Sequence, residues 1–273
     1  MDGSQTFSLW QVLVLAVVQG VAEFLPISSD GHLVVVAPLL FGGRSAPPNM
    51  MDLTIVLHMG TLGSILIFYR QRIARLFGVD RQVIPLLIVG TAPAVVLVLC
   101  AKLVFDEWLE PVLQNRLLAG FMLPVSGLAI LWSMRIKPGD REYRDLTWRD
   151  SLVIGVCQAA AILPGLSRSG STIASGLALG MTRSAAASYS FLLAIPALCG
   201  AGLYEMVSMW KDREPLSTSP ENLALGAVVS FGVGLVALWG LERLLQRGQL
   251  HWLGWYCIAL GAGVIAWQLA LLG

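Results

Sequence analysis

Charge is scarce in this 273-residue chain, in which Asp, Glu, Lys and Arg together make up 13% of the residues. A soluble domain carries about 25% charged residues. Hydrophobic residues reach 56%, and no long polar stretch interrupts them, which excludes a large soluble domain. The apolar runs are about 20 residues long, the length that crosses the hydrocarbon core of a bilayer. We therefore expect an all-α integral membrane protein with a single polytopic domain over residues 1–273.

Cysteine pairs, basic residues near the start and an excess of positive charge are also lacking. The four cysteines lie in apolar stretches and none forms a Cys-x-x-Cys pair, which favours buried small side chains over metal ligands. No Lys or Arg precedes the first apolar run, so the sequence predicts no cleavable signal peptide. A net charge of +1 gives no bulk attraction to nucleic acid, and we expect no nucleic-acid partner.

The apolar runs predict helical segments at residues 9–24, 31–41, 52–70, 83–104, 116–134, 150–163, 170–181, 186–209, 221–241 and 251–272. Three of them, 31–41, 150–163 and 170–181, are too short to cross, and short apolar segments are often re-entrant. With 9–24 they would form two hairpins. Each half of the chain would then hold one re-entrant helical hairpin and three transmembrane helices. Because three is odd, the halves, at about 8–134 and 150–272, would form an inverted-topology repeat.

Two similar loops support this repeat. Residues 24–32 read Phe-Leu-Pro-Ile-Ser-Ser-Asp-Gly-His, and residues 162–172 read Ile-Leu-Pro-Gly-Leu-Ser-Arg-Ser-Gly-Ser-Thr. A shift of 138 positions places Leu25-Pro26 on Leu163-Pro164 and Ser29 on Ser167. Two broken apolar helices at matching places in two halves are typical of a binding site near the membrane midplane.

The basic residues predict the orientation of the chain. Segments 70–81, 135–149 and 242–249 lie on one side of the predicted topology and hold 11 of the 18 Lys and Arg residues. The opposite loops, near 102–116 and 210–221, hold four basic and six acidic residues. By the positive-inside rule the first set faces the cytoplasm. Both chain ends and the entrance of the first hairpin would then face outward.

Ionisable residues in apolar stretches usually serve function, because each costs about 2.5–3.5 kcal/mol at bilayer depth. They are Glu23, Asp30, His32, His58 and Arg168. Gln19 and Glu23 are four residues apart and share one helix face. Ser28, Ser29 and His32 follow the break, and a hydroxyl near an imidazole suits nucleophilic or general-base chemistry. His58 is interpreted as a packed core histidine or a partner of the site residues rather than a ligand.

The second loop, from Pro164 to Thr172, combines hydroxyls and backbone N–H groups with Arg168 at the start of a helix. A helix N-terminus carries about +0.5 charge and exposed donors, which favours an anion. The guanidinium fork matches phosphate oxygens, so the expected ligand is a lipid phosphate. In the structural alternative, Ser167 would cap the helix and Arg168 would pair with Glu23. Ser28, Ser171 and Thr172 could equally be caps or contacts between helices.

Both loops resemble motifs of the undecaprenyl-pyrophosphate phosphatases, the bacitracin-resistance family of bacterial inner membranes. The first family motif, Glu or Gln, three residues, Glu, and then Pro-x-Ser-Ser-x-Gly-His, is matched from Gln19 to His32. The second, Pro-Gly-x-Ser-Arg-Ser-x-x-Thr, is matched from Pro164 to Thr172. Two positions differ from the usual pattern. Gln19 is the non-ionisable choice at its place, and Asp30 replaces Thr or Ser. Asp30 would either help to hold a cation or change the protonation of a neighbour.

The resemblance implies hydrolysis of undecaprenyl diphosphate to undecaprenyl phosphate, the carrier lipid for peptidoglycan, at the outer side of the cytoplasmic membrane. The implied catalytic residues are Glu23, Ser29, His32 and Arg168, with Ser29, His32 or a water as nucleophile. The implied phosphate-binding residues are Ser28, Ser167, Arg168, Ser169 and Thr172. Gln19 and Glu23 would hold a divalent cation, Mg²⁺ or Ca²⁺. The implied partners are the polyprenyl diphosphate and membrane lipid, and a homodimer stays open.

Three other functions fit the sequence less well than hydrolysis of a lipid diphosphate. A lipid-phosphate transporter or flippase would share the inverted repeat and the arginine, but it needs no nucleophile or base. The phosphatidic-acid-phosphatase superfamily requires a further His shortly after a Ser-Arg pair, and no His lies between His58 and His251. A P-loop kinase is excluded because the chain contains no GxxxxGK[ST] motif.

Overall fold

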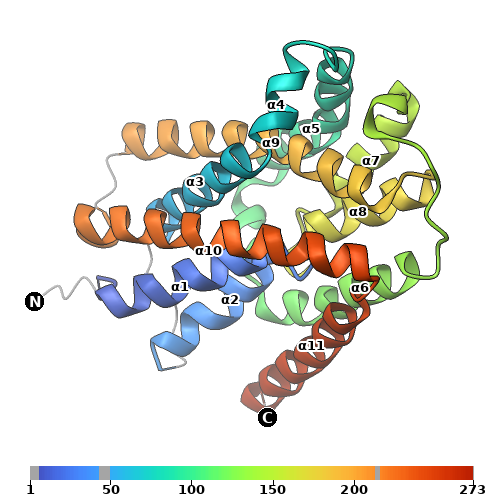
Figure 1. Cartoon of the computed structure of the whole chain (residues 1–273). Helices are drawn as coiled ribbons and strands as arrows, with labels where there is room; N and C mark the ends of the chain where they lie inside the picture. Colours follow the sequence, from blue (N-terminus) through green and yellow to red (C-terminus); the bar gives the residue numbers. More distant parts are fainter. Residues whose placement is uncertain (1–5, 43–49, 213–215, 273) are drawn as a thin grey trace, which may run out of the picture.

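The computed structural model describes residues 6–42, 50–212 and 216–272 (Figure 1). These ranges are helical and contain no strand, apart from an isolated bridge between Arg141 and Met181. The first half contains α1 (Leu9–Ala22), α2 (Ser29–Leu40), α3 (Met51–Phe68), α4 (Arg70–Leu76), α5 (Val83–Leu113) and α6 (Arg116–Ser133). The short 3₁₀ helix η1 (Tyr143–Asp145) precedes the second half. That half contains α7 (Trp148–Ala160), α8 (Arg168–Ala178), α9 (Arg183–Asp212), α10 (Pro220–Arg247) and α11 (His251–Leu272).

Six helices of the described ranges are long and apolar enough to cross a membrane, namely α3, α5, α6, α9, α10 and α11. The prediction of an all-α membrane protein is therefore confirmed, as is the number of long helices, three in each half. The helices α1, α2, α7 and α8 are short, with 11 to 14 residues each. The two loops that interrupt them are the two similar loops of the sequence.

Several helix boundaries differ from the predicted ones. The seven-residue α4 was not predicted, because it is short and rich in arginine. The helix α5 continues to Leu113, past the predicted end at residue 104, and α10 continues to Arg247, past 241. The predicted ends followed the loss of hydrophobicity, whereas Lys, Arg and Glu are good helix formers. Gly248, with φ of 67°, ends α10 in the left-handed conformation common after helices.

Each short hairpin packs on a long helix from the other half, α1 on α10 and α7 on α5. Figure 1 shows α10 running alongside α1. Small residues allow these close approaches, as is usual between helices in membranes. A Cβ on Gly155 would lie 2.4 Å from the carbonyl oxygen of Gly90, and one on Gly20 would lie 2.9 Å from that of Ser230. One helix of each hairpin is therefore packed closely against a long helix of the opposite half.

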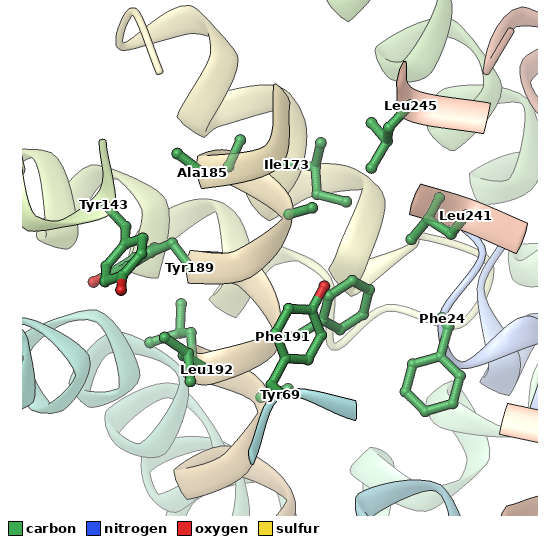
Figure 2. Close-up of a cluster of buried hydrophobic side chains, with 14 of the residues drawn as sticks. Phe24, Tyr69, Tyr143, Ile173, Ala185, Tyr189, Phe191, Leu192, Leu241 and Leu245 are labelled. Atoms are coloured by element: carbon green, nitrogen blue, oxygen red, sulfur yellow. The ribbon is translucent and has the colours of Figure 1, made fainter. Parts of the chain in front are cut away.

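The phenylalanine beside the site anchors the first loop in the core. Phe24 is fully buried and its ring meets Phe191 edge to face, with ring centroids 5.7 Å apart. Tyr69 stacks on the same Phe191 at 5.7 Å. Figure 2 shows these three rings together, drawn from three separate parts of the chain. Aromatic pairs of this kind contribute about 0.5–1.5 kcal/mol beyond their buried area. They fix the backbone that carries Glu23.

The three basic segments meet on one face of the molecule. The hydroxyl of Tyr143 donates a hydrogen bond of 2.5 Å to Asp80, and the guanidinium of Arg72 lies over the Tyr143 ring. Arg72 also donates to Ser184. Arg183, next along the chain, donates to the carbonyl oxygen of Leu245. Side chains thus link segments 70–81 and 135–149 directly, and Arg183 and Ser184 connect segment 242–249 to them. On the opposite side, residues 213–215 and the side chains of 105–110, 210 and 212 lie outside the described part.

Asp80 is the centre of this basic face. Its side chain is fully buried in the loop between α4 and α5. Burial alone would raise the pKa of Asp80, but the Tyr143 hydroxyl and the Arg75 guanidinium, 2.9 Å away, lower that pKa below its ordinary value. Asp80 is therefore ionised in the folded protein, and it ties the loop after α6 to the end of α4.

Candidate functional site

The first loop connects the end of α1 to the start of α2, and Ser28 caps α2. The chain leaves the helix before Pro26, whose ring removes a backbone donor. Ser28 adopts φ of 70°, a conformation that costs a non-glycine residue about 1–3 kcal/mol. Its Oγ caps α2 by accepting a hydrogen bond from the backbone N–H of Gly31, and it accepts a second from Gly165 at 3.1 Å. Ser28 therefore joins the two loops.

Glycine permits this junction because the two loops cross in direct backbone contact. A Cβ on Gly31 would lie 2.8 Å from the Cα of Gly165, closer than real Cβ atoms come. Gly165 has φ of 92°, which an L side chain rarely adopts, and a Cβ there would lie 2.4 Å from the carbonyl oxygen of Ala119. The glycines of the two motifs are thus required by space and by backbone conformation.

Ser167 caps α8 as Ser28 caps α2, by accepting from the backbone N–H of the glycine three residues on, here Gly170. The caps are 139 positions apart, so the predicted pairing of Ser29 with Ser167 is wrong by one residue. The second loop has one residue more between its proline and its cap. Ser29 therefore corresponds to Arg168, and these two are the first residues of α2 and α8.

The two first residues meet on one carboxylate. The hydroxyl of Ser29 donates to Oε2 of Glu23 at 2.8 Å, and Nη2 of Arg168 donates to Oε1. The Gln19 amide, one turn earlier on α1, donates to Oε2 at 3.1 Å. Glu23 and Gln19 are buried, with 6% and 0% of their surface exposed. The start of each short helix thus faces a buried anion, which both helix dipoles favour.

Two polar atoms at this carboxylate have no partner. Nη1 of Arg168 and Oε1 of Gln19 are both buried and lack a hydrogen bond within the described part of the chain. A buried unsatisfied donor or acceptor costs about 1–3 kcal/mol, and more when charged. These two atoms are therefore free to bind a ligand at the place where the two loops meet.

His58 joins the same cluster, which the sequence did not establish. Its Nε2 lies 3.6 Å from Oε2 of Glu23, and its Nδ1 donates to the carbonyl oxygen of Thr54 at 2.8 Å. Asp30 and Glu205 are close enough to act on His58 electrostatically. Of the two readings of His58, the structure supports a partner of the site residues. The signal was its place in an apolar span.

His32 lies apart from the carboxylate. Its Nδ1 is 2.7 Å from the carbonyl oxygen of Ser28, and its Nε2 is 2.8 Å from the hydroxyl of Tyr256. No hydrogen bond or ion pair joins His32 to Glu23 or Ser29 in the described ranges. The expected meeting of imidazole and serine hydroxyl is therefore not seen. Tyr256, which belongs to neither motif, was missed.

The predicted phosphate-binding hydroxyls of the second loop are turned into the protein. Ser167 and Ser169 lie 3.2 Å apart, Oγ to Oγ, and Ser169 also donates to the carbonyl oxygen of Leu25. Thr172 donates to the carbonyl oxygen of Arg168 and shares a hydrogen bond with Ser190 at 2.6 Å. All are at most 2% exposed. As placed here they shape the loop, while Arg168 reaches the site.

The metal prediction rests on few ligands. No group of three or more His, Cys, Asp and Glu side chains suited to a metal ion occurs among the described residues. Glu23 supplies a carboxylate, and the Gln19 amide, whose nitrogen donates to that carboxylate, has its Oε1 without a partner. Such a pair suits Mg²⁺, which one or two carboxylates hold together with waters and substrate phosphates.

Fold and site together define a polytopic helical membrane protein with a buried polar centre where two broken helices meet. The family described as "Bacitracin resistance protein BacA" has a model that matches residues 12–263. The chain is 45% identical to an undecaprenyl-diphosphatase of Rhodopirellula baltica over 257 residues, 94% of this chain and 97% of the relative. Undecaprenyl-diphosphatases of Mycobacterium leprae and Mycobacterium tuberculosis are 37% and 33% identical over 97% of this chain and 96% of theirs. The chain belongs to the bacitracin resistance protein family, so the resemblance is confirmed.

Proposed function

We propose that this protein hydrolyses undecaprenyl diphosphate to undecaprenyl phosphate and inorganic phosphate. The reaction recycles the carrier lipid for peptidoglycan and thereby confers bacitracin resistance. The observation that carries the proposal is the meeting of Ser29 and Arg168 on the carboxylate of Glu23. The names of the relatives supply the substrate, because each is called an undecaprenyl-diphosphatase.

In this proposal Arg168 binds the terminal phosphate. Its Nη2 is engaged by Glu23 and its Nη1 is free, so the guanidinium can take a phosphate oxygen without leaving the carboxylate. Stabilising charge on the phosphoryl oxygens is the main task in phosphoryl transfer. The N-termini of α2 and α8 add two helix dipoles of the right sign.

Glu23 serves as the proton acceptor. Its Oε2 accepts the hydrogen bond of Ser29, at a distance normal for a nucleophile and its base. Either Ser29 or a water hydrogen-bonded at its place attacks the terminal phosphorus, the bond from that phosphorus to the bridging oxygen breaks, and undecaprenyl phosphate leaves. Attack by water releases inorganic phosphate directly, whereas attack by Ser29 forms a phosphoserine that a water then hydrolyses. His32, which lies on the other side of the first loop, accepts or donates a second proton. His58, facing Glu23, offsets the negative charge beside the phosphate.

Glu23 and Gln19 would hold the divalent cation, Mg²⁺ or Ca²⁺, which would neutralise phosphate charge when bound. The unpartnered Oε1 of Gln19, on the amide whose nitrogen donates to Glu23, supports this assignment. Phosphate release with and without a chelator tests it.

The proposed architecture is an inverted repeat in the cytoplasmic membrane, with two re-entrant hairpins that enter from opposite faces. Equivalent contacts between the two halves support this repeat. The first short helix of each half packs on a long helix of the other half, α1 on α10 and α7 on α5. The matched caps of Ser28 and Ser167 support it as well. The clustering of the basic segments supports a cytoplasmic position for that face and an outward site.

Phosphate release from purified protein in detergent tests the proposed function. A lipid-phosphate flippase has no membrane to work across in detergent and would release none. The hydrogen bond from Ser29, which is partly exposed, to buried Glu23 favours the enzyme, since a translocator needs no such pair. We expect release from undecaprenyl diphosphate that is abolished in Glu23→Gln. Equal release by the parent protein and Glu23→Gln would contradict the assignment of the site. If neither protein releases phosphate, the proposed function is wrong.

A further inference from the structure

His32 receives a partner from the last helix of the chain. The hydroxyl of Tyr256 on α11 lies 2.8 Å from Nε2 of His32, across 224 residues of sequence. The two rings are nearly parallel, with 17° between their planes and centroids 5.7 Å apart. Tyr256 reaches the first loop from a helix that otherwise packs mainly on α6.

The neighbours of this pair determine where its protons lie. Nδ1 of His32 is 2.7 Å from the carbonyl oxygen of Ser28, which can only accept, so Nδ1 carries a proton. A neutral imidazole then presents its lone pair at Nε2, and the Tyr256 hydroxyl donates to that lone pair. The two partners together select one tautomer and one ring orientation.

Backbone packing determines the position of the Tyr256 hydroxyl. A Cβ on Gly127 of α6 would lie 2.5 Å from the carbonyl oxygen of Gly254, and one on Gly261 would lie 2.7 Å from that of Gly120. Helices in such close contact cannot slide or rotate without a clash. Cys257, the next residue, is fully buried. Tyr256 itself is 44% exposed, while its hydroxyl reaches His32, which is only 7% exposed.

We infer that Tyr256 is a positioning residue for the reaction, whose hydroxyl holds the His32 imidazole in one tautomer and one orientation, with Nε2 directed out of α2. The inference rests on the proposed function, in which His32 handles a proton. A general base acts only in the correct tautomer and orientation, so loss of this hydrogen bond reduces turnover rather than binding.

Replacement of Tyr256 by Phe keeps the stacked ring and removes only the hydroxyl. We expect kcat for undecaprenyl diphosphate to fall at least about tenfold, with KM nearly unchanged. Trp255→Phe is the matched control, because Trp255 is an exposed aromatic neighbour on the same helix, and it should retain full turnover. In a His32→Asn background, Tyr256→Phe should cost nothing further, because it acts through His32. Full turnover of Tyr256→Phe, or an additive loss in the double variant, would overturn the inference.

Nitrogen-15 NMR of histidine-labelled protein tests the hydrogen bond without activity. The chain has three histidines, and His32→Asn assigns the relevant signals. We expect a protonated Nδ1 in the parent protein, and an Nε2 resonance that moves toward that of a free lone pair in Tyr256→Phe. An unchanged Nε2 resonance overturns the inference whatever the turnover. If the parent releases no phosphate from the lipid, the proposed function fails while this measurement still decides the role of Tyr256.

Discussion

At the scale of single residues, the site is defined by what surrounds one buried carboxylate. Glu23 is contacted by a guanidinium, a hydroxyl, an amide and an imidazole, and each comes from a different turn or helix. Among these four contacts, Arg168 combines a full positive charge with a buried terminal nitrogen that has no hydrogen-bond partner in the described ranges. The phosphate is therefore expected to enter beside Arg168, between the starts of α2 and α8.

Arg168→Lys should leave the fold intact and reduce phosphate release about 10²-fold or more, the usual loss when a donor to a developing charge is removed. Lysine keeps the charge, but it cannot bind Glu23 and a phosphate oxygen through one planar fork. Initial rates on the lipid diphosphate measure this. Arg183→Lys, the same change on the basic face, is the control and should keep its rate. Near-normal turnover of Arg168→Lys would remove Arg168 from the site.

At the scale of elements, the two broken helices are held together by direct backbone contact as well as by side chains. Ser28 bonds to Gly165 across the crossing, and Gly31 touches Gly165 directly. The crossing sets the separation of the first residues of α2 and α8, so it also sets the geometry around Glu23. Packing here is expected to govern activity and stability together.

Gly31→Ala should lower both the unfolding temperature and the rate, because the added Cβ would stand 2.8 Å from the Cα of Gly165. Overpacking of this kind costs about 1–3 kcal/mol. Thermal unfolding in detergent measures the stability. Gly240→Ala is the matched control, since a Cβ at that position of α10 meets nothing within 4 Å and alanine favours a helix. If the crossing does not affect activity, Gly31→Ala and Gly240→Ala will release phosphate at the same rate.

Much of this arrangement follows from local sequence, and the remainder depends on contacts between distant elements. Lengths of apolar runs predicted the six long helices, and the Pro, Gly and Ser residues of the two loops predicted the breaks at Pro26 and Pro164. The register between the loops was missed by one residue, because only the caps of Ser28 and Ser167 reveal it. The link from His32 to Tyr256 spans 224 residues, and no pattern at either position encodes it.

At the scale of the whole molecule, the basic face contains a second buried polar cluster, which has a structural role rather than a catalytic one. There the buried carboxylate of Asp80 connects α4 to the segment that joins the two halves. A hydrogen bond to a charged group contributes about 1.5–3 kcal/mol. The segment between the halves is thus fixed by Tyr143 and Arg75.

Tyr143→Phe should destabilise the protein by about 1.5–3 kcal/mol at neutral pH, since it removes the hydroxyl that donates to Asp80. The pKa of Asp80 is lowered on folding, so its contribution is present above the ordinary aspartate range and is lost as the pH falls below about 4. Unfolding temperatures of the two proteins should therefore converge in acid. Tyr204→Phe, whose ring faces Lys102, is the control. A difference that persists unchanged into acid would exclude Asp80 as the partner.

The orientation of the molecule can be tested with single cysteines in a background without the four natural ones. Ser28 is a poor probe because it is buried and accepts two hydrogen bonds. Leu216 and Val79 are better, being 47% and 73% exposed on the face opposite the basic segments and on the basic face, respectively. Positive-inside topology places Leu216 outside and Val79 in the cytoplasm. An impermeant thiol reagent added to intact cells should label Leu216→Cys at once and Val79→Cys only after permeabilisation. The reverse pattern would turn the site toward the cytoplasm, so the lipid diphosphate would have to be hydrolysed there.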